Sequence, residues 1–192
     1  MQTQINDLVI HVYGHASACP DLVAQCFSGV TPEETSGEAD LAIFAIDPSA
    51  GIDQNTIDQW IELDEYQIPR LVVVTGLEKQ EADFDDAVMI ANRVFDQMIT
   101  PYLVLHDDDG YPIALISLQD LTIINYAMQP PTKNASEPEH QTLVQEFRDE
   151  YLELLQSLGE GSFAAGLMFP AIPLWIEKGI GVDIVKNYIS EL

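Results

Sequence analysis

The amino-acid sequence predicts an α/β fold: a mostly parallel β-sheet with helices on both faces and a small antiparallel β insert. Short, continuous apolar runs typical of buried strands alternate with stretches of helical periodicity. Such alternation implies right-handed crossovers and a parallel sheet. In one segment the expected strands follow one another without a helix between them, and this segment predicts the antiparallel insert. The chain of 192 residues is long enough for one domain with a real core.

The strands and helices of the main sheet follow from these patterns. Four apolar runs are expected to form strands: residues 8–13, 41–46, 71–75 and 167–172. Pro170 places the last of them at a sheet edge or at a strand end, because proline has no N–H to donate to a neighbouring strand. Helices are expected at about 21–28, 54–66, 84–98, 138–158 and 182–191.

The insert is predicted from residues 102–127, where two or three strands flank an Asp109-Gly110 turn typical of a hairpin. The consecutive acids just before this glycine are expected to be a solvated turn rather than a cation site. The polar, proline-containing stretch 129–140 is expected to be a loop or linker. We therefore divide the chain into a core of residues 1–100 and 160–192 and an insert of residues 101–159.

Charge is the strongest signal in the composition. Asp and Glu number 32 against 7 Lys and Arg, a net charge of −25. Such a surface repels phosphate backbones, so we expect no direct binding of nucleic acid. One explanation of the charge is solubility or a salt-adapted proteome. The alternative is that this protein mimics a nucleic acid and so occupies the binding site of a basic, nucleic-acid-binding protein.

The apolar stretches, the N-terminus and the cysteines indicate in which cellular compartment the protein is expected. No apolar stretch approaches the ~18 residues of a membrane span, and the N-terminus lacks the basic start and apolar region of a signal peptide. Cys19 and Cys26 lie seven residues apart on one expected helix, which suits neither a disulfide nor a typical metal knuckle. A cytoplasmic protein without a metal site is the expectation.

Residues 11–27, HVYGHASACPDLVAQCF, have the layout of a phosphate-binding loop: an apolar strand, a glycine, a short loop and a helix. Such loops read G-x-x-x-x-G-K-[ST]. Counted from Gly14, the last three positions hold Cys19, Pro20 and Asp21. Pro20 offers neither a cation nor a backbone N–H. Asp21 adds a negative charge that faces the phosphates. We expect the lost lysine, the lost N–H and this repulsion together to exceed ~5 kcal/mol, roughly four decades of affinity for a nucleotide.

Longer stretches carry a family resemblance. Residues 39–88 hold an acidic strand end at Asp47 followed by Ala50-Gly51-Ile52, then Ile68-Pro69-Arg70 and Ala82-Asp83-Phe84. In this order and spacing they resemble the GTPase domain of bacterial elongation factor G and related translational GTPases. Residues 112–126 look like the G′ subdomain of that family, and the C-terminal GIGVDIVKNYISEL is similar to its final helix. The resemblance implies a truncated, degenerate P-loop GTPase-like fold with a G′-like insert.

The resemblance also shows where the nucleotide motifs depart from the family. His15 matches a histidine of the family's phosphate loop. The base-reading Asn-Lys-x-Asp motif falls on Thr75-Gly76-Leu77-Glu78, and the last motif falls near Ile172-Pro173-Leu174 without its serine. The connection 28–40 is too short for the switch region, two strands and the Asp-x-Pro-Gly-His motif. The degenerate nucleotide-site positions are thus Gly14, His15, Cys19, Pro20, Asp21, Thr75, Gly76, Glu78, Ile172, Pro173 and Leu174.

The resulting expectation is a non-catalytic pseudo-GTPase, a protein-binding or regulatory module linked to translation, with no cofactor and no catalytic residues. The alternatives are a divergent GTPase that binds GTP or GDP with Mg²⁺, and the acidic mimic. By resemblance, the expected partner is a protein associated with the ribosome or with a translation factor. Because the family's second and third strands are absent, strand 8–13 lies at a sheet edge. That edge is expected to pair with another copy in a homodimer, or to be covered by residues 28–40.

Overall fold

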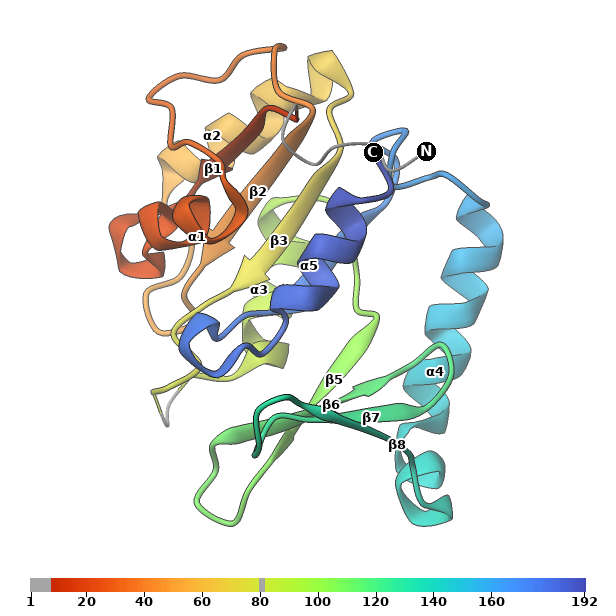
Figure 1. Ribbon diagram of the computed structural model, residues 1–192. Helices are drawn as coiled ribbons and strands as arrows, with labels where there is room; N and C mark the ends of the chain where they lie inside the picture. The colour runs from red at the N-terminus through yellow and green to blue at the C-terminus, as the bar shows by residue number, and fades with distance from the viewer. Residues whose placement is uncertain (1–7, 80–81) are drawn as a thin grey trace.

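The computed structural model describes residues 8–79 and 82–192, and its centre is a five-stranded parallel sheet (Figure 1). The strands run in the order β1-β2-β3-β9-β4, and all four neighbouring pairs are parallel. Their bounds are Ile10–Tyr13 for β1, Leu41–Ile46 for β2, Arg70–Val74 for β3, Phe169–Pro173 for β9 and Met98–Ile99 for β4. The predicted α/β fold with a mostly parallel sheet is confirmed.

Helices cover both faces of this sheet because its strands are apolar on both sides. Alternate residues of β2 enter two different cores: Leu41 and Ile43 one, Ala42 and Phe44 the other. The first core is completed by α1 and α5, and the second by α2 and α3. The helix bounds are Pro20–Phe27 for α1, Gln54–Glu62 for α2, Phe84–Val94 for α3 and Val182–Ile189 for α5. Every residue of β2 and β3 is buried, as a doubly covered parallel sheet requires.

Arg70 shows why an arginine opens β3. Its side chain is 2% exposed, and its guanidinium lies 4.5 Å from the ring centre of Trp60 and 4.7 Å from that of Phe169. It donates to the Trp60 carbonyl at 2.8 Å and forms an ion pair with Asp64. The cation therefore ties the end of α2 to the sheet through aromatic and charged contacts at once.

Three details of the main sheet differ from the prediction. The helix predicted over 84–98 ends at Val94, and Met98 belongs to the short strand β4. The Asn92 side chain accepts a hydrogen bond from the Met98 N–H at 2.7 Å, so a polar side chain ends the helical pattern. The last strand is not an edge strand, because β9 lies between β3 and β4. The alternative of a strand end is confirmed, since Pro170 is one residue from the start of β9, before the residues that pair with β3.

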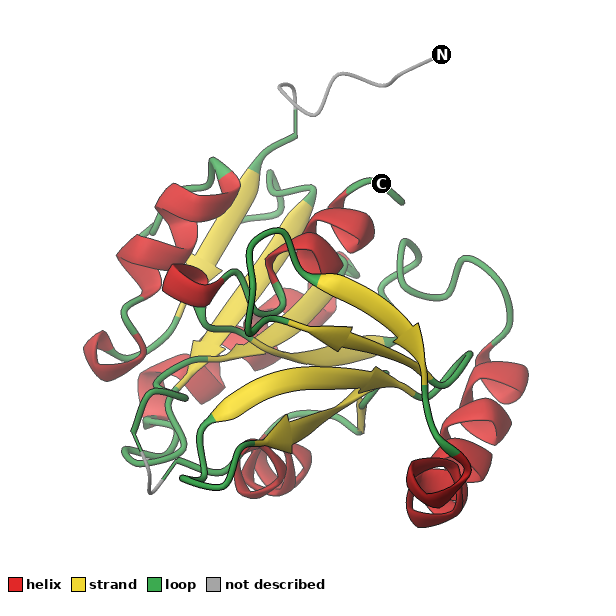
Figure 2. Cartoon of the chain, turned by 60° about the horizontal axis from the view of Figure 1, so that its bottom comes forward, coloured by secondary structure: helices red, strands yellow, loops and turns green. Residues whose placement is uncertain are grey.

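Between β4 and β9 the chain forms the second, antiparallel sheet (Figure 2). Its four strands, in order, are β5 Tyr102–His106, β6 Pro112–Ser117, β7 Thr122–Asn125 and β8 Thr132–Ala135. The β5–β6 hairpin is as predicted, and the Asp107 carboxylate accepts from the N–H groups of Asp109 and Tyr111 in its turn. The predicted linker 129–140 is wrong in part, because Thr132–Ala135 pair with β7 as an exposed edge strand.

The long acidic helix predicted over 138–158 is confirmed as α4, Pro138–Leu158, with proline in its first turn. Arg148 of α4 donates to the carbonyl oxygens of Leu118 and Gln119 at 3.1 and 3.2 Å, which holds the helix against the antiparallel sheet. Among the described residues, no helix is both long and apolar enough to cross a membrane. The division into a core and an insert of 101–159 stays a prediction, and residues 1–7 and 80–81 of that core lie outside the described part.

Strand β1 lies at the edge of the parallel sheet, as the shortened connection predicts. Val30 follows α1 and pairs with His11 as an isolated parallel bridge. Its N–H donates to the Ile10 carbonyl at 2.9 Å, and its carbonyl accepts from the Val12 N–H at 2.8 Å. Residues of the 28–40 connection therefore occupy two of the edge groups that a further strand would use. The homodimer through this edge stays a prediction.

Candidate functional site

The loop between β1 and α1 is the first part of the candidate site. Gly14 has φ +150°, and a Cβ there would lie 2.4 Å from the Ala45 carbonyl oxygen, so the loop leaves the sheet where only glycine fits. Residues Ala16–Ala18 then form one 3-10 turn, and Cys19 adopts a left-handed conformation with φ 52° before α1 begins at Pro20.

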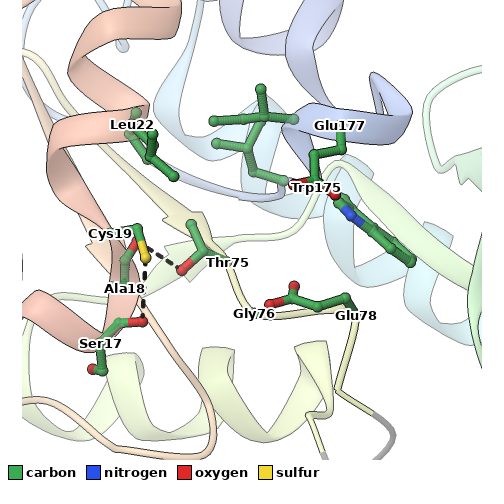
Figure 3. Close-up of a pocket in the computed structure, with 12 residues that line it drawn as sticks. Ser17, Ala18, Cys19, Leu22, Thr75, Gly76, Glu78, Trp175 and Glu177 are labelled. Carbon is green, nitrogen blue, oxygen red and sulfur yellow. Dashed lines mark hydrogen bonds between the residues drawn. The ribbon is translucent and has the colours of Figure 1, made fainter.

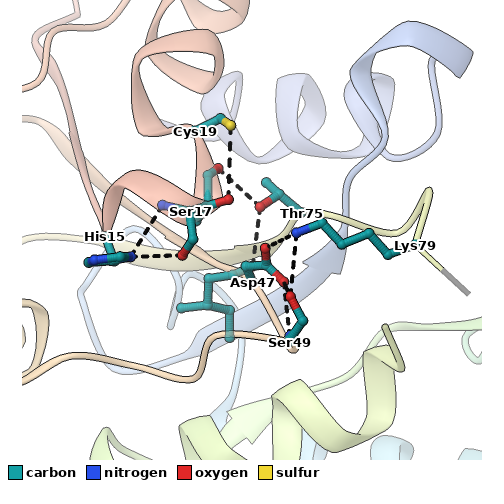
Figure 4. A network of polar contacts seen from close by, with 9 residues as sticks. His15, Ser17, Cys19, Asp47, Ser49, Thr75 and Lys79 are labelled. Atoms are coloured by element: carbon teal, nitrogen blue, oxygen red, sulfur yellow. Dashed lines mark hydrogen bonds and ion pairs between the residues drawn. The ribbon is translucent and has the colours of Figure 1, made fainter. Parts of the chain in front are cut away.

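Three backbone donors of this loop are used within the loop itself. The Ser17 N–H donates to His15 Nδ1 at 3.2 Å, and Ser17 Oγ lies 2.8 Å from the same nitrogen (Figure 4). The Ala18 N–H donates to the His15 carbonyl at 2.9 Å, and the Cys19 N–H donates to the Ala16 carbonyl at 3.1 Å. Three successive N–H groups are thus engaged, and the fourth residue, Pro20, has no N–H. A phosphate-binding loop instead needs N–H groups that are free to point at its ligand.

The first turn of α1 already carries a negative charge. Asp21 lies in that turn, and its carboxylate accepts a hydrogen bond from Thr31 Oγ1 at 2.8 Å. A carboxylate here interacts favourably with the positive end of the helix. An incoming phosphate would meet this carboxylate instead of a lysine.

A polar network at the ends of β2 and β3 forms the second part of the site (Figure 4). Asp47, 1% exposed, follows β2 and forms an ion pair with Lys79. Ser49 donates to the same carboxylate through its N–H at 2.9 Å and its hydroxyl at 2.7 Å. Burial alone would raise the pKa of Asp47, but the hydrogen bonds from Lys79 and Ser49 outweigh it and hold the pKa below its ordinary value. The hydrogen bond to Asp47 in turn raises the pKa of Lys79.

This ion pair fixes the loop after β3. Gly76 has φ +72°, and a Cβ there would lie 3.0 Å from the Asp47 carboxylate, so the backbone of the loop passes directly over the carboxylate. Thr75 Oγ1 lies 3.0 Å from the Ala18 carbonyl and 3.3 Å from the Ile46 carbonyl, both acceptors for its proton. The loops after β1, β2 and β3 are therefore joined by side-chain contacts at the carboxyl end of the sheet.

A cavity of about 150 Å³ opens beside these loops (Figure 3). Its polar walls include Cys19, Thr75 and the carboxylates of Glu78 and Glu177, and its apolar walls include Leu22 and Trp175. All of its lining residues are neutral or acidic. Sites for drug-sized ligands usually measure about 300–1,000 Å³. The cavity is small for a nucleotide, and its charge opposes phosphate.

The structure brings together part of the predicted set. Cys19, Thr75, Gly76, Glu78 and Leu174 line the cavity. Gly14, His15, Pro20 and Asp21 form the adjoining loop and helix start. Ile172 and Pro173 are buried in β9 instead. These positions stay predictions as nucleotide-site residues.

Sequence reasoning named Asp47 but missed its ion pair with Lys79, and among the residues of the cavity wall it missed Trp175 and Glu177. For Lys79 a signal exists, since it stands next to Glu78 in the degenerate base-reading motif. Asp47 and Lys79 lie 32 positions apart in the chain, so nothing local predicts their pairing.

Comparisons with known proteins agree with this fold. No family model matches the chain. An elongation factor G-like protein of Mycobacterium tuberculosis is 29% identical over 74% of this chain and 23% of its own length. The mitochondrial ribosome-releasing factor 2 of Anopheles gambiae is 38% identical over 28% of this chain and 7% of its own length.

The comparison with solved structures gives the fold alone. A crystal structure of a Thermus thermophilus protein matches with a TM-score of 0.70 and 23% identity, over 84% of this chain and 28% of that protein. The chain spans less than a quarter of the length of the elongation factor G-like relative. The chain is therefore similar in sequence to part of an elongation factor G-like protein and of a ribosome-releasing factor 2, and it shares the fold of part of the Thermus thermophilus protein.

Proposed function

We propose that the chain is a pseudo-GTPase: a non-catalytic module that keeps the shape of a translation-factor GTPase domain and has lost its nucleotide. The observation that supports this most strongly is the loop after β1. Its amides at Ser17, Ala18 and Cys19 donate to acceptors within the loop, and Pro20 follows them. An anion would have to break these hydrogen bonds before it could be bound, each worth about 0.5–1.5 kcal/mol.

The charges around the loop support the same proposal. The position of the phosphate-binding lysine holds Pro20, and the next holds Asp21. The nearest lysine on the neighbouring loops, Lys79, already forms an ion pair with the buried Asp47. Removing Lys79 from this pair would leave a buried carboxylate without a counter-charge, which costs more than an exposed ion pair gains.

A module without nucleotide chemistry acts by binding. We propose a protein partner linked to translation, because the relatives with sequence similarity are named as an elongation factor G-like protein and ribosome-releasing factors. The net charge of −25 favours a partner with a basic surface.

A second candidate is a divergent GTP- or GDP-binding protein. One observation favours it: Thr75 and Glu78, at the base-reading positions, still line a cavity beside the loop. A glutamate can accept hydrogen bonds from a guanine base as the family's aspartate does.

Thermal melting with and without millimolar GTP, GDP and Mg²⁺ separates the two candidates. A ligand at ~100 times its Kd stabilises a fold by about 2.7 kcal/mol, a shift of several degrees. We expect no guanine-specific shift. ATP serves as the matched control for charge and ionic strength. A shift with GTP or GDP that ATP does not produce would restore the second candidate and overturn the proposal.

A further inference from the structure

A second cavity, distant in sequence from the loops described above, lies where the antiparallel sheet, α4 and α5 meet. It measures about 180 Å³. Tyr102 of β5, Tyr151 of α4, and Asn187 and Tyr188 of α5 contribute to its wall, together with Glu191 just after α5. Figure 1 shows α5 running between the parallel sheet and α4, with β5 below it. The cavity therefore joins parts of the chain that fold as separate elements.

Three tyrosine hydroxyls share this cavity with one carboxylate. The Tyr151 side chain is only 6% exposed. Within residues 8–79 and 82–192, no side-chain hydrogen bond is formed by the hydroxyls of Tyr102, Tyr151 or Tyr188. None of these three oxygen atoms is among the buried side-chain atoms that lack a partner, so solvent reaches them and they are open to a ligand. The cavity thus holds hydrogen-bonding capacity that the described protein groups do not use.

The pKa shifts of Tyr151 and Tyr188 agree with a short distance between these side chains, Tyr102 and Glu191. Burial, followed by the neighbouring Tyr102 and Glu191, raises the pKa of Tyr151 to about 12. Burial, followed by Tyr151, Glu191 and Tyr102, raises the pKa of Tyr188. Each hydroxyl is therefore neutral near pH 7 and can accept as well as donate a hydrogen bond.

The charge of the cavity selects a cation. In the described part of the chain, Glu191 is the only charged group that lines it, and burial raises the pKa of this carboxylate. Asp120 stands close enough to raise the pKa of Tyr102. A metal ion is disfavoured, because among the described residues no three carboxylate, histidine or cysteine side chains gather in a metal-binding group.

We propose that this cavity binds a small organic ammonium ion. Glu191 supplies the counter-charge, and the hydroxyls of Tyr151 and Tyr188 and the amide oxygen of Asn187 accept its N–H groups. A primary alkylammonium has three N–H donors, which matches this set of acceptors around one carboxylate. The cavity volume suits a small ligand or the amine end of a longer one. Because the acceptors come from α4, from α5 and from the residues just after α5, the bound cation also fastens α4 to the main core. The proposal does not depend on the nucleotide site.

Titration calorimetry with putrescine at about 0.15 M NaCl tests the proposal, since this ionic strength screens diffuse attraction to the acidic surface. We expect saturable binding of one cation per chain. Glu191→Gln should weaken it at least about tenfold, the effect of one charge-assisted hydrogen bond. Tyr151→Phe, which removes one hydroxyl and keeps the ring, should weaken it several-fold.

Glu153→Gln is the matched control, because it makes the same change of charge on the exposed face of α4. Binding should be unchanged in this variant. Tetramethylammonium, which has the charge but no N–H, should bind far more weakly than methylammonium. Equal losses in Glu191→Gln and Glu153→Gln would show that putrescine is only a counter-ion of the acidic surface. That result, or no saturable binding to the unchanged protein, would overturn the proposal.

Discussion

Gly14 sets the path of the loop that carries the candidate site. The substitution Gly14→Ala, which adds one methyl group, tests this role. We expect Gly14→Ala to lower the free energy of unfolding by about 2–3 kcal/mol, because its Cβ would lie 2.4 Å from the Ala45 carbonyl oxygen. Gly110→Ala is the control: its φ is +86°, but nothing lies within 4 Å of the added Cβ. It should cost about 1–2 kcal/mol, from backbone strain alone. Urea denaturation measures both, and equal costs would contradict the close approach at Gly14.

The ion pair between Asp47 and Lys79 predicts a dependence of stability on pH. Lys79→Met leaves the buried Asp47 carboxylate with Ser49 as its hydrogen-bond donor, and should cost about 1–3 kcal/mol at pH 7. The pKa of Asp47 in the folded protein lies below its ordinary value of 3.8. Its contribution to stability is therefore complete above that value, and is lost as the pH falls through the lower pKa of the folded state.

The difference between the unchanged protein and Lys79→Met should accordingly be constant from pH 7 to about pH 5 and shrink towards pH 3. Urea denaturation at each pH measures it. Asp47→Asn combined with Lys79→Met should cost less than the sum of the single changes, since the two groups interact directly. A difference that grows on acidification would contradict this account of the pair.

At the scale of elements, Val30 decides whether the edge of the main sheet is closed. Val30→Pro removes the N–H that donates to the Ile10 carbonyl and frees an edge group of β1. We expect greater self-association, because exposed strand edges pair with other chains. Val30→Thr keeps the backbone hydrogen bonds and is the control. Sedimentation velocity measures both variants, and an unchanged molecular mass in Val30→Pro would show that this bridge does not protect the edge.

The elements of the fold differ in how far their sequences predict them. Long apolar runs such as 41–46 predict buried strands well, because both faces of a parallel strand enter a core. The strands β4 and β8 could not be predicted: β4 has two residues, and β8 is exposed throughout and has three polar residues followed by Ala135. Their pairing is set by tertiary contacts with β9 and β7, which a local pattern does not contain.

The candidate site is predicted less completely than the fold. Three motif positions of the resemblance, Cys19, Thr75 and Glu78, line one cavity, and their assignment to a degenerate nucleotide site stays a prediction. The internal hydrogen bonds of the loop could not be foreseen, since they depend on the left-handed conformation of Cys19 and on His15 as the cap of a single 3-10 turn. The sequence shows that Pro20 stands where the phosphate-loop motif has lysine, whereas only the structure shows that the amides of Ser17, Ala18 and Cys19 are engaged.

For the whole molecule, the net charge of −25 predicts a stability that depends on salt. Repulsion among surface carboxylates opposes the compact state, and salt screens it over a Debye length of about 10 Å at 0.1 M. We expect the melting temperature to rise by several degrees when the NaCl concentration is raised from about 0.02 M to about 0.5 M. Differential scanning calorimetry measures the rise. A flat or falling melting temperature would show that ion pairs outweigh the repulsion.

The loop after β1 has the layout of a phosphate-binding loop, while its amides at Ser17, Ala18 and Cys19 donate within the loop itself. The most direct measurement is the NMR shift of the backbone amides of Ser17, Ala18 and Cys19 as GDP and Mg²⁺ are added to millimolar concentration. We predict that these resonances do not move beyond the change produced by ADP and Mg²⁺. Saturable shifts of these amides with GDP and Mg²⁺, but not with ADP and Mg²⁺, would show that the loop opens to receive phosphate. That result would contradict the pseudo-GTPase account.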